Sequence, residues 1–190
     1  TIVTGEYADA DGDLWRVAVK CRAEKYAEKI VKELEELSKE YDGYFKERRY
    51  PKTLIVAPNI KEAEMLKDAL ENIVRCSNIN VNISIAHSKI EDSHNIIENF
   101  KRKDSASNAI LITVNMADIG FDDPNLEVLI LARPFRNWAS YIQVTGRVLR
   151  KPKSQISLKK IAEKVVIIDL TGKTISDEEA RRKEESGFIL

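Results

Sequence analysis

The stretch "TLIVAPNIKEAEMLKDALENIV", residues 53–74, joins a strand pattern directly to a helix pattern. Residues 53–58 form a short, continuous apolar run, as expected of a strand buried on both faces of a parallel sheet. Asn59 is followed three residues later by Glu62, a spacing that resembles a capping box at the start of a helix. Apolar residues then recur on one helical face, at Ala63, Leu66, Leu70, Ile73 and Val74. The stretch therefore predicts one strand followed by one helix.

The same alternation continues along the chain. Further apolar runs predict buried strands at residues 82–87, 109–114, 127–132 and 164–169. Ile96, Ile97 and Phe100 mark another helix, and a third helix, between the last two strands, carries "YIQVTGRVLR" (141–150). Alternating strands and helices imply βαβ units, and right-handed crossovers make the sheet doubly wound. The expected fold class is α/β, with a doubly wound parallel sheet and helices on both faces.

The first fifty residues have a different pattern. Residues 1–14 are polar and indicate a linker, and "LWRVAVK" (14–20) alternates well enough to predict a short strand. From Arg22 to about Tyr44, apolar residues at helical spacing predict one long amphipathic helix. We therefore expect a leading region of residues 1–50, an α/β domain of residues 51–170 and a charged tail of residues 171–190.

The composition limits the classes of function. Lys and Arg number 31 and Asp and Glu also number 31, so the whole surface lacks the basic footprint of many nucleic-acid binders. A local patch is still allowed, because the segment from Val128 to Ala162 has no acid and eight basic residues: Arg133, Arg136, Arg147, Arg150, Lys151, Lys153, Lys159 and Lys160. We interpret the lysines from 151 to 160 as a solvated basic face.

Two polar stretches follow predicted strands, where doubly wound sheets bind ligands. In "NMADIGFDDPN" (115–125), Gly120 would let the backbone approach a ligand and Asp122 would accept a hydrogen bond from a hydroxyl. A tight turn ended by Asp-Pro is the alternative. In "QVTGRVLR" (143–150), Arg147 and Arg150 lie three apart, so on a helix they share a face. Arginine suits bidentate binding of phosphate.

Several other classes of site lack support in the sequence. No apolar run approaches the roughly 18 residues that a membrane span needs. The two cysteines, Cys21 and Cys76, lack metal-binding spacing and indicate reduced thiols in a cytoplasmic protein, and no metal-ligand cluster is visible. The chain begins with Thr1 and shows no signal peptide, so we expect a segment of a longer protein.

Read in order, these motifs resemble those of the second RecA-like motor domain of superfamily 2 helicases and translocases. "TLIVAPN" (53–59) looks like motif IV, and "ILITVNMADIGFDDP" (110–124) is similar to motif V. "QVTGRVLR" (143–150) matches the motif VI pattern Q-x-x-G-R-x-x-R. The resemblance covers residues 50–170, and motifs V and VI together make it specific.

The resemblance implies a role for each motif. ATP and Mg²⁺ would lie in a cleft against a first RecA-like domain that carries the P-loop and the DExH box. The resemblance assigns catalysis to Arg147 and Arg150, which would reach the γ-phosphate, and ATP binding to Gly120, Asp122 and Gln143. It assigns contacts with the nucleic-acid backbone to Asn59, Ser88 and Asn115. Without the first domain, the segment should not hydrolyse ATP.

Departures from the family pattern narrow the choice. Ile119 and Val144 replace residues that are usually charged, and Leu149 stands where DEAD-box RNA helicases carry Gly. The motifs look most like DNA translocases and helicases of the type I and III restriction and repair group, which work beside other subunits or domains. Half of an RNA helicase is the nearest alternative. A docking module that kept the fold without the motor is another, from a different class.

Overall fold

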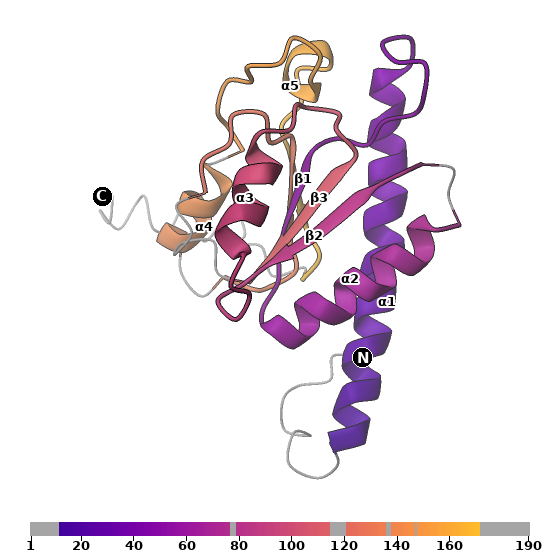
Figure 1. Cartoon of the computed structure of the whole chain (residues 1–190), viewed down its shortest axis with the longest axis vertical. Coiled ribbons are helices and arrows are strands. Elements are labelled where there is room, and N and C mark those ends of the chain that lie inside the picture. The colour runs from indigo at the N-terminus through magenta and orange to yellow at the C-terminus, as the bar shows by residue number, and fades with distance from the viewer. Residues whose placement is uncertain (1–11, 77–78, 115–120, 136–137, 147, 172–190) are drawn as a thin grey trace, which may run out of the picture.

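The computed structural model of the chain describes residues 12–76, 79–114, 121–135, 138–146 and 148–171 (Figure 1). Within these ranges the elements follow one another as α1 (Gly12–Ser38), the 3-10 helix η2 (Lys39–Tyr41), β1 (Thr53–Val56), α2 (Ile60–Val74), β2 (Asn82–Ala86), α3 (Ser93–Lys101), β3 (Ala109–Thr113), β4 (Val128–Leu131), α4 (Trp138–Thr145), α5 (Leu158–Ile161) and β5 (Val166–Asp169). The five strands predicted within residues 51–170 are all present, within a few residues of their expected bounds.

The strands form one parallel sheet in the order β2-β3-β1-β4-β5. Leu54 of β1 pairs in register with Leu111 of β3 on one side and with Leu129 of β4 on the other. The chain therefore builds one half of the sheet on one side of β1 and crosses to the other side for β4 and β5. This order confirms the expected doubly wound α/β fold class.

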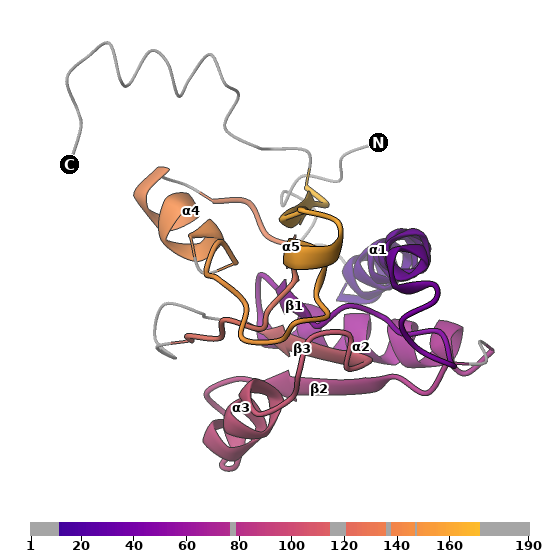
Figure 2. The same ribbon diagram turned by 90° about the horizontal axis from the view of Figure 1, so that it is seen from above.

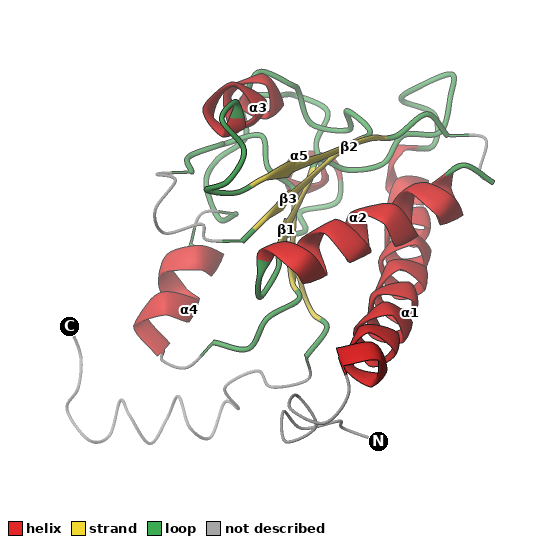
Figure 3. Cartoon of the chain, turned by 60° about the horizontal axis from the view of Figure 1, so that its bottom comes forward, coloured by secondary structure: helices red, strands yellow, loops and turns green. Residues whose placement is uncertain are grey.

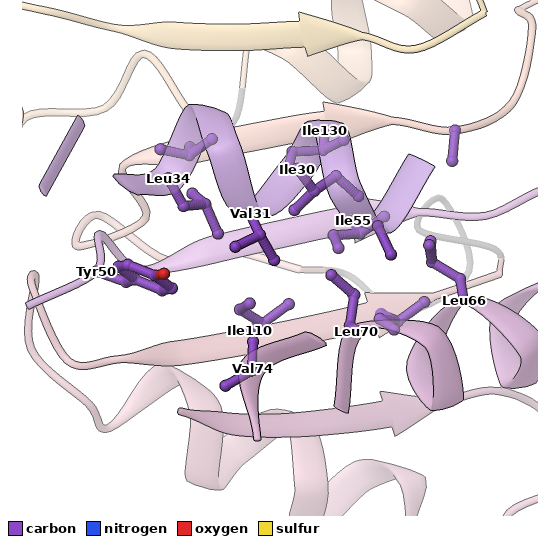
Figure 4. Close-up of a cluster of buried hydrophobic side chains, with 14 of the residues drawn as sticks. Ile30, Val31, Leu34, Tyr50, Ile55, Leu66, Leu70, Val74, Ile110 and Ile130 are labelled. Carbon is purple, nitrogen blue, oxygen red and sulfur yellow. The ribbon is translucent and has the colours of Figure 1, made fainter. Parts of the chain in front are cut away.

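Alternate side chains of the central strands enter two separate cores. Ile55, Ile110 and Ile130 point to the face covered by α1 and α2, where Ile30, Leu34, Leu66 and Leu70 meet them (Figure 4). Leu54, Leu111 and Leu129 point to the opposite face, against Ile97 and Phe100 of α3 and Val144 of α4. Figure 3 shows α1 and α2 on one side of the strands and α3 on the other. Burial on both faces explains why the strands read as continuous apolar runs.

The strand expected at residues 14–20 is wrong, because these residues belong to α1. A strand would place Val17 and Val19 on one face, yet Val17 is 58% exposed and Val19 is buried. Val19 instead continues the helical stripe of Ala23, Ala27 and Ile30. Two valines and a tryptophan in a short window fit the period of a strand as well as that of a helix. The packing of α1 against α2 and the sheet selects the helix.

The predicted start of α2 after Asn59 is confirmed, with Asn59 as its N-cap and Glu62 as its partner. The Asn59 side chain accepts a hydrogen bond from the Glu62 backbone N–H at 2.9 Å and donates one to the Glu62 carboxylate at 2.9 Å. The first residues of the expected linker, 1–11, and the expected tail beyond Thr171 lie outside the described residues.

Candidate functional site

Three of the predicted site residues, Asn115, Gly120 and Arg147, lie outside the described residues. The roles expected for them therefore stay predictions. The described candidates are Asp122, Gln143 and Arg150 on the ATP side, and Asn59 and Ser88 on the nucleic-acid side.

The structure brings Asp122 and Arg150 together although 28 residues separate them. An Arg150 guanidinium nitrogen donates to the Asp122 carboxylate at 2.6 Å. Both side chains remain about half exposed, at 56% and 51%, so the pair lies on the surface rather than in the core. An exposed ion pair of this kind stabilises a fold by only about 0–1 kcal/mol. The guanidinium is thus held in one place by a contact that another anion can replace.

The helix expected to carry both arginines ends earlier than the sequence indicates. α4 stops at Thr145, and the chain turns through Gly146, with the Val148 N–H bonded to the Thr145 carbonyl and the Leu149 N–H bonded to the Gly146 carbonyl. A Cβ at Gly146 would lie 3.0 Å from the Ile142 carbonyl oxygen, so the turn leaves little room for a side chain. Arg150 is therefore not on α4, and a shared helical face does not place it.

Val148 anchors this turn. Its side chain is fully buried in the core that includes Leu131 and Val144. Arg150 follows two residues later and is exposed, and Gln143 is exposed on α4 itself. Among its described residues, the motif VI stretch thus combines Val144 and Val148, which fill the core, with Gln143 and Arg150, which face solvent.

Asn59 and Ser88 lie at the carboxyl ends of β1 and β2, as the sequence predicts. Both residues are exposed. Asn59 already uses its amide to cap α2, so its side chain has a structural role there. Ser88 follows the buried His87, whose Nδ1 accepts a hydrogen bond from the Lys89 N–H at 3.3 Å.

The Asp122–Arg150 pair lies in a different part of the sheet. Its neighbour Asp123 forms a buried ion pair of 2.7 Å with Lys52, the residue immediately before β1. The pair therefore lies toward the amino ends of the strands, whereas Asn59 and Ser88 lie at the carboxyl ends. We expected every candidate beyond the carboxyl ends, and for Asp122 and Arg150 this is wrong.

A buried polar network supports this connection. The Glu127 carboxylate accepts hydrogen bonds from the Tyr41 hydroxyl and from the backbone N–H groups of Lys52, Ala106 and Leu158, at 2.5–2.9 Å. Burial raises the pKa of Glu127, and these donors oppose that shift. The Lys52–Asp123 pair is buried as well. Its burial lowers the pKa of Lys52 and raises the pKa of Asp123. These contacts fix the start of β4 against α5 and η2.

Two residues near Arg150 were missed by the sequence interpretation. Asn125 is buried, and its side-chain oxygen accepts from the Lys153 and Ser154 N–H groups at 3.0 and 3.2 Å. Lys159 donates to the carbonyls of Arg150 and Pro124 at 2.8 and 3.3 Å, so it is not part of a solvated face. Figure 2 shows the segment between α4 and α5 to which these contacts belong. An isolated Asn and one Lys of a basic run carry no pattern that would single them out.

The described part of the chain offers no cluster of three or more His, Cys, Asp or Glu side chains that could hold a metal ion. Within the same ranges, none of the helices combines the length and the apolar character that a bilayer crossing needs.

Solved structures share the fold of this chain. Domain 2 of the DEAD-box helicase Mss116p, bound to an RNA duplex, matches with a TM-score of 0.53 and 22% identity, over 90% of this chain and 57% of that chain. The T4 protein UvsW matches with a TM-score of 0.50 and 13% identity, over 94% of this chain and 36% of that chain. The chain thus spans little more than half the length of the first of these relatives, and at such identities the likeness concerns the fold alone.

Among curated protein sequences none matches this chain. The family described as "Helicase conserved C-terminal domain" matches residues 29–152, which include the strands β1–β4 and the Asp122–Arg150 pair. The match begins within α1, so part of that helix belongs to the conserved unit. The solved structures share the parallel α/β fold of this chain, which is RecA-like. The family match, which covers more than half of the chain, shows that the chain belongs to the helicase C-terminal domain family.

Proposed function

We propose that this domain forms one wall of an ATP site in a nucleic-acid-dependent motor and supplies Arg150, together with Arg147, to the γ-phosphate. The observation that carries the proposal is the Asp122–Arg150 pair, which presents a guanidinium at the surface beside the turn that follows α4. ATP and Mg²⁺ would be held mainly by a first RecA-like domain. The described residues here offer a phosphate ligand and no carboxylate cluster for a metal.

The chemistry of the pair suits this role. A guanidinium presents five N–H donors in a planar fork that fits phosphate oxygens. In the free domain, one nitrogen of the Arg150 guanidinium donates to the Asp122 carboxylate. Separating this exposed pair costs little free energy. Asp122 would then accept from a nucleotide hydroxyl, and Gly120 and Gln143 would line the same cleft. Because hydrolysis spreads negative charge over the γ-phosphoryl oxygens, a fixed cation lowers the barrier more than it strengthens ATP binding.

The nucleic-acid side is proposed to lie at the carboxyl ends of β1, β2 and β3. Ser88 and Asn59 are exposed there, and Asn115 follows β3 in the sequence. Because of the motif V and VI sequences, we propose double-stranded DNA as the nucleic acid and a restriction or repair complex as the setting. The two cysteines without disulfide or metal-binding spacing favour the cytoplasm. RNA is the second candidate, favoured by the fold shared with domain 2 of Mss116p bound to an RNA duplex.

The test uses a parent protein that contains both RecA-like domains. Arg150→Ala should lower nucleic-acid-stimulated ATP hydrolysis by about 10³–10⁵-fold, equivalent to roughly 4–7 kcal/mol of barrier. Nucleotide affinity and thermal stability should change little, because the side chain is exposed and its only described partner is Asp122. Arg150→Lys should rescue poorly, since an ammonium lacks the planar fork.

Arg48→Ala is the matched control, because Arg48 is an exposed arginine in the segment before β1, outside motifs V and VI. It should hydrolyse ATP at the parent rate. Single-turnover phosphate release, nucleotide binding and a melting curve are measured for every variant. If Arg150→Ala keeps the parent rate of hydrolysis, Arg150 is not a catalytic arginine and the proposal fails.

A further inference from the structure

The segment from Val148 to Ser157, here called the arginine segment, joins α4 to α5 and carries Arg150. Within the described residues it contains no helix or strand, so no ladder of backbone hydrogen bonds fixes it. Val148 is buried at one end and Ser157 at the other, and Leu149, Arg150 and Lys151 between them are exposed. The position of the Arg150 guanidinium therefore depends on contacts that neighbouring elements make with this segment.

Lys159 makes such a contact. Its ammonium donates to the Arg150 carbonyl at 2.8 Å and to the Pro124 carbonyl at 3.3 Å. Pro124 follows Asp122 by two residues, so one side chain bridges the backbone of the Arg150 turn to the connection that carries its carboxylate partner. The bridge has a fixed base, because Leu158 is fully buried and its N–H bonds to Glu127.

The environment of Lys159 differs from that of its neighbours in the basic run. Its side chain is half-buried, and burial lowers the pKa of its ammonium, although Glu127 and Asp123 oppose that shift. Lys160, the next residue, is exposed and donates to the side chain of Gln155 at 3.0 Å. The half-buried Lys159 ammonium donates to two carbonyls and has a desolvation cost. The exposed Lys160 ammonium avoids this cost.

Asn125 provides a second tether on the same segment, one residue after the Pro124 carbonyl that Lys159 contacts. Its buried side-chain oxygen accepts from both the Lys153 and Ser154 N–H groups. The connection from Asp122 to Asn125 is thus joined to the arginine segment at three places, namely the Asp122–Arg150 ion pair, the Lys159 bridge and the Asn125 amide.

We propose that Lys159 is a positioning residue, which clamps the backbone at Arg150 to the Asp122–Asn125 connection and so sets where the guanidinium lies. The inference rests on the proposed function of Arg150 for its effect on hydrolysis, but the clamp itself is a property of this domain. This role distinguishes Lys159 from Lys160, although the sequence predicts one solvated basic face for both lysines.

Loss of the clamp should reduce turnover rather than nucleotide binding. Arg150 remains present in such a variant, but its backbone is no longer held, and a misplacement of about 1 Å at a reacting group can cost on the order of 100-fold in rate. Because the contact with γ-phosphate matters most in the transition state, kcat should fall while KM for ATP changes little.

The experiment compares Lys159→Met, which keeps the length of the side chain and removes its donors, with Lys160→Met as the matched control. Both are made in the parent protein with two RecA-like domains, beside Arg150→Ala. Lys159→Met should lower kcat by roughly 10–100-fold. It should also speed hydrogen exchange at the backbone amides of Lys153 and Ser154, relative to those of α2. Lys160→Met should change neither quantity, and Lys159→Arg should restore part of kcat.

The two measurements separate the clamp from the proposed function. If Arg150→Ala abolishes hydrolysis while Lys159→Met leaves both kcat and exchange at the parent values, the clamp is wrong and the proposed function stands. If Arg150→Ala has no effect, the proposed function fails, and exchange in the arginine segment alone decides the clamp. Equal losses in Lys159→Met and Lys160→Met would show a general effect of surface charge and overturn the assignment. Melting curves ensure that every rate is compared at a temperature where each variant is folded.

Discussion

At the scale of single residues, the adjacent carboxylates Asp122 and Asp123 have opposite environments. Asp122 is 51% exposed and pairs with Arg150, whereas Asp123 is 1% exposed and pairs with Lys52, which is fully buried. The two chemically identical groups therefore differ in what their loss would do. A surface pair contributes about 0–1 kcal/mol to stability, but removal of one partner from a buried pair leaves an uncompensated charge.

Lys52→Met should consequently destabilise the domain by about 3–5 kcal/mol. The ammonium also donates to the Lys101 and Lys103 carbonyls and lies 4.9 Å from the centre of the Phe100 ring, so its loss removes several contacts of the buried site. Urea unfolding of the purified domain measures the change.

The matched control is Lys67→Met, because Lys67 forms a partly exposed i,i+4 pair of 2.7 Å with Glu71 on α2. It should cost no more than about 0.5 kcal/mol. The double variant Lys52→Met with Asp123→Leu should regain part of the lost stability, since neither charge is then left alone in the core. Equal stabilities of Lys52→Met and Lys67→Met would contradict the buried ion pair.

At the scale of elements, α1 is an integral part of the domain rather than a leader to it. Ile30, Leu34 and Ala27 are fully buried and belong to the same core as β1 and α2. Arg22 adds a contact of 2.6 Å with Glu62, in the first turn of α2. The sequence pattern separated residues 1–50 from the α/β domain, but α1 helps to cover one face of the sheet. The family match begins at residue 29, within α1, and agrees with this.

The two valines near the start of α1 provide a direct test of its helical register. Val19→Lys should destabilise the domain by about 1.5–3 kcal/mol, because the buried apolar side chain is replaced by a charge. Val17→Lys is the matched variant and should be nearly neutral, because Val17 is exposed. Urea unfolding distinguishes them, and a strand over residues 14–20 would instead make the two substitutions equivalent.

At the scale of the whole molecule, the described candidates for the two ligands lie toward opposite ends of the sheet. Exposed Asn59 and Ser88 lie at the carboxyl ends of the strands, and the Asp122–Arg150 pair lies toward the amino ends. The chain has equal numbers of basic and acidic residues, so a long-range positive field does not attract nucleic acid to the whole surface. Binding by this domain alone then depends on a few local contacts with phosphates.

We expect the domain alone to bind nucleic acid weakly, with a steep dependence on salt and no preference for sequence. If about three to five phosphates are neutralised, the logarithm of the association constant should fall against the logarithm of salt concentration with a slope of about −3 to −4.5 for duplex DNA. Fluorescence anisotropy with DNA and RNA duplexes of equal length and several sequences measures both properties. Tight binding to one sequence that persists at high salt would contradict contacts with the backbone alone.

Local sequence determined the parallel sheet, since each buried strand has its own apolar run and each helix its own period, and it indicated motifs V and VI. The tertiary structure decided which elements share a core, so it extended α1 through residues 14–20 and ended α4 at Thr145. It also decided that Arg150 meets Asp122 and that Lys159, unlike Lys160, holds the Arg150 carbonyl. The spacing of apolar residues indicates which residues face the core, because buried positions recur at regular intervals along a helix or a strand. Contacts between side chains distant in sequence depend on how the connections cross the sheet, and that has no local pattern.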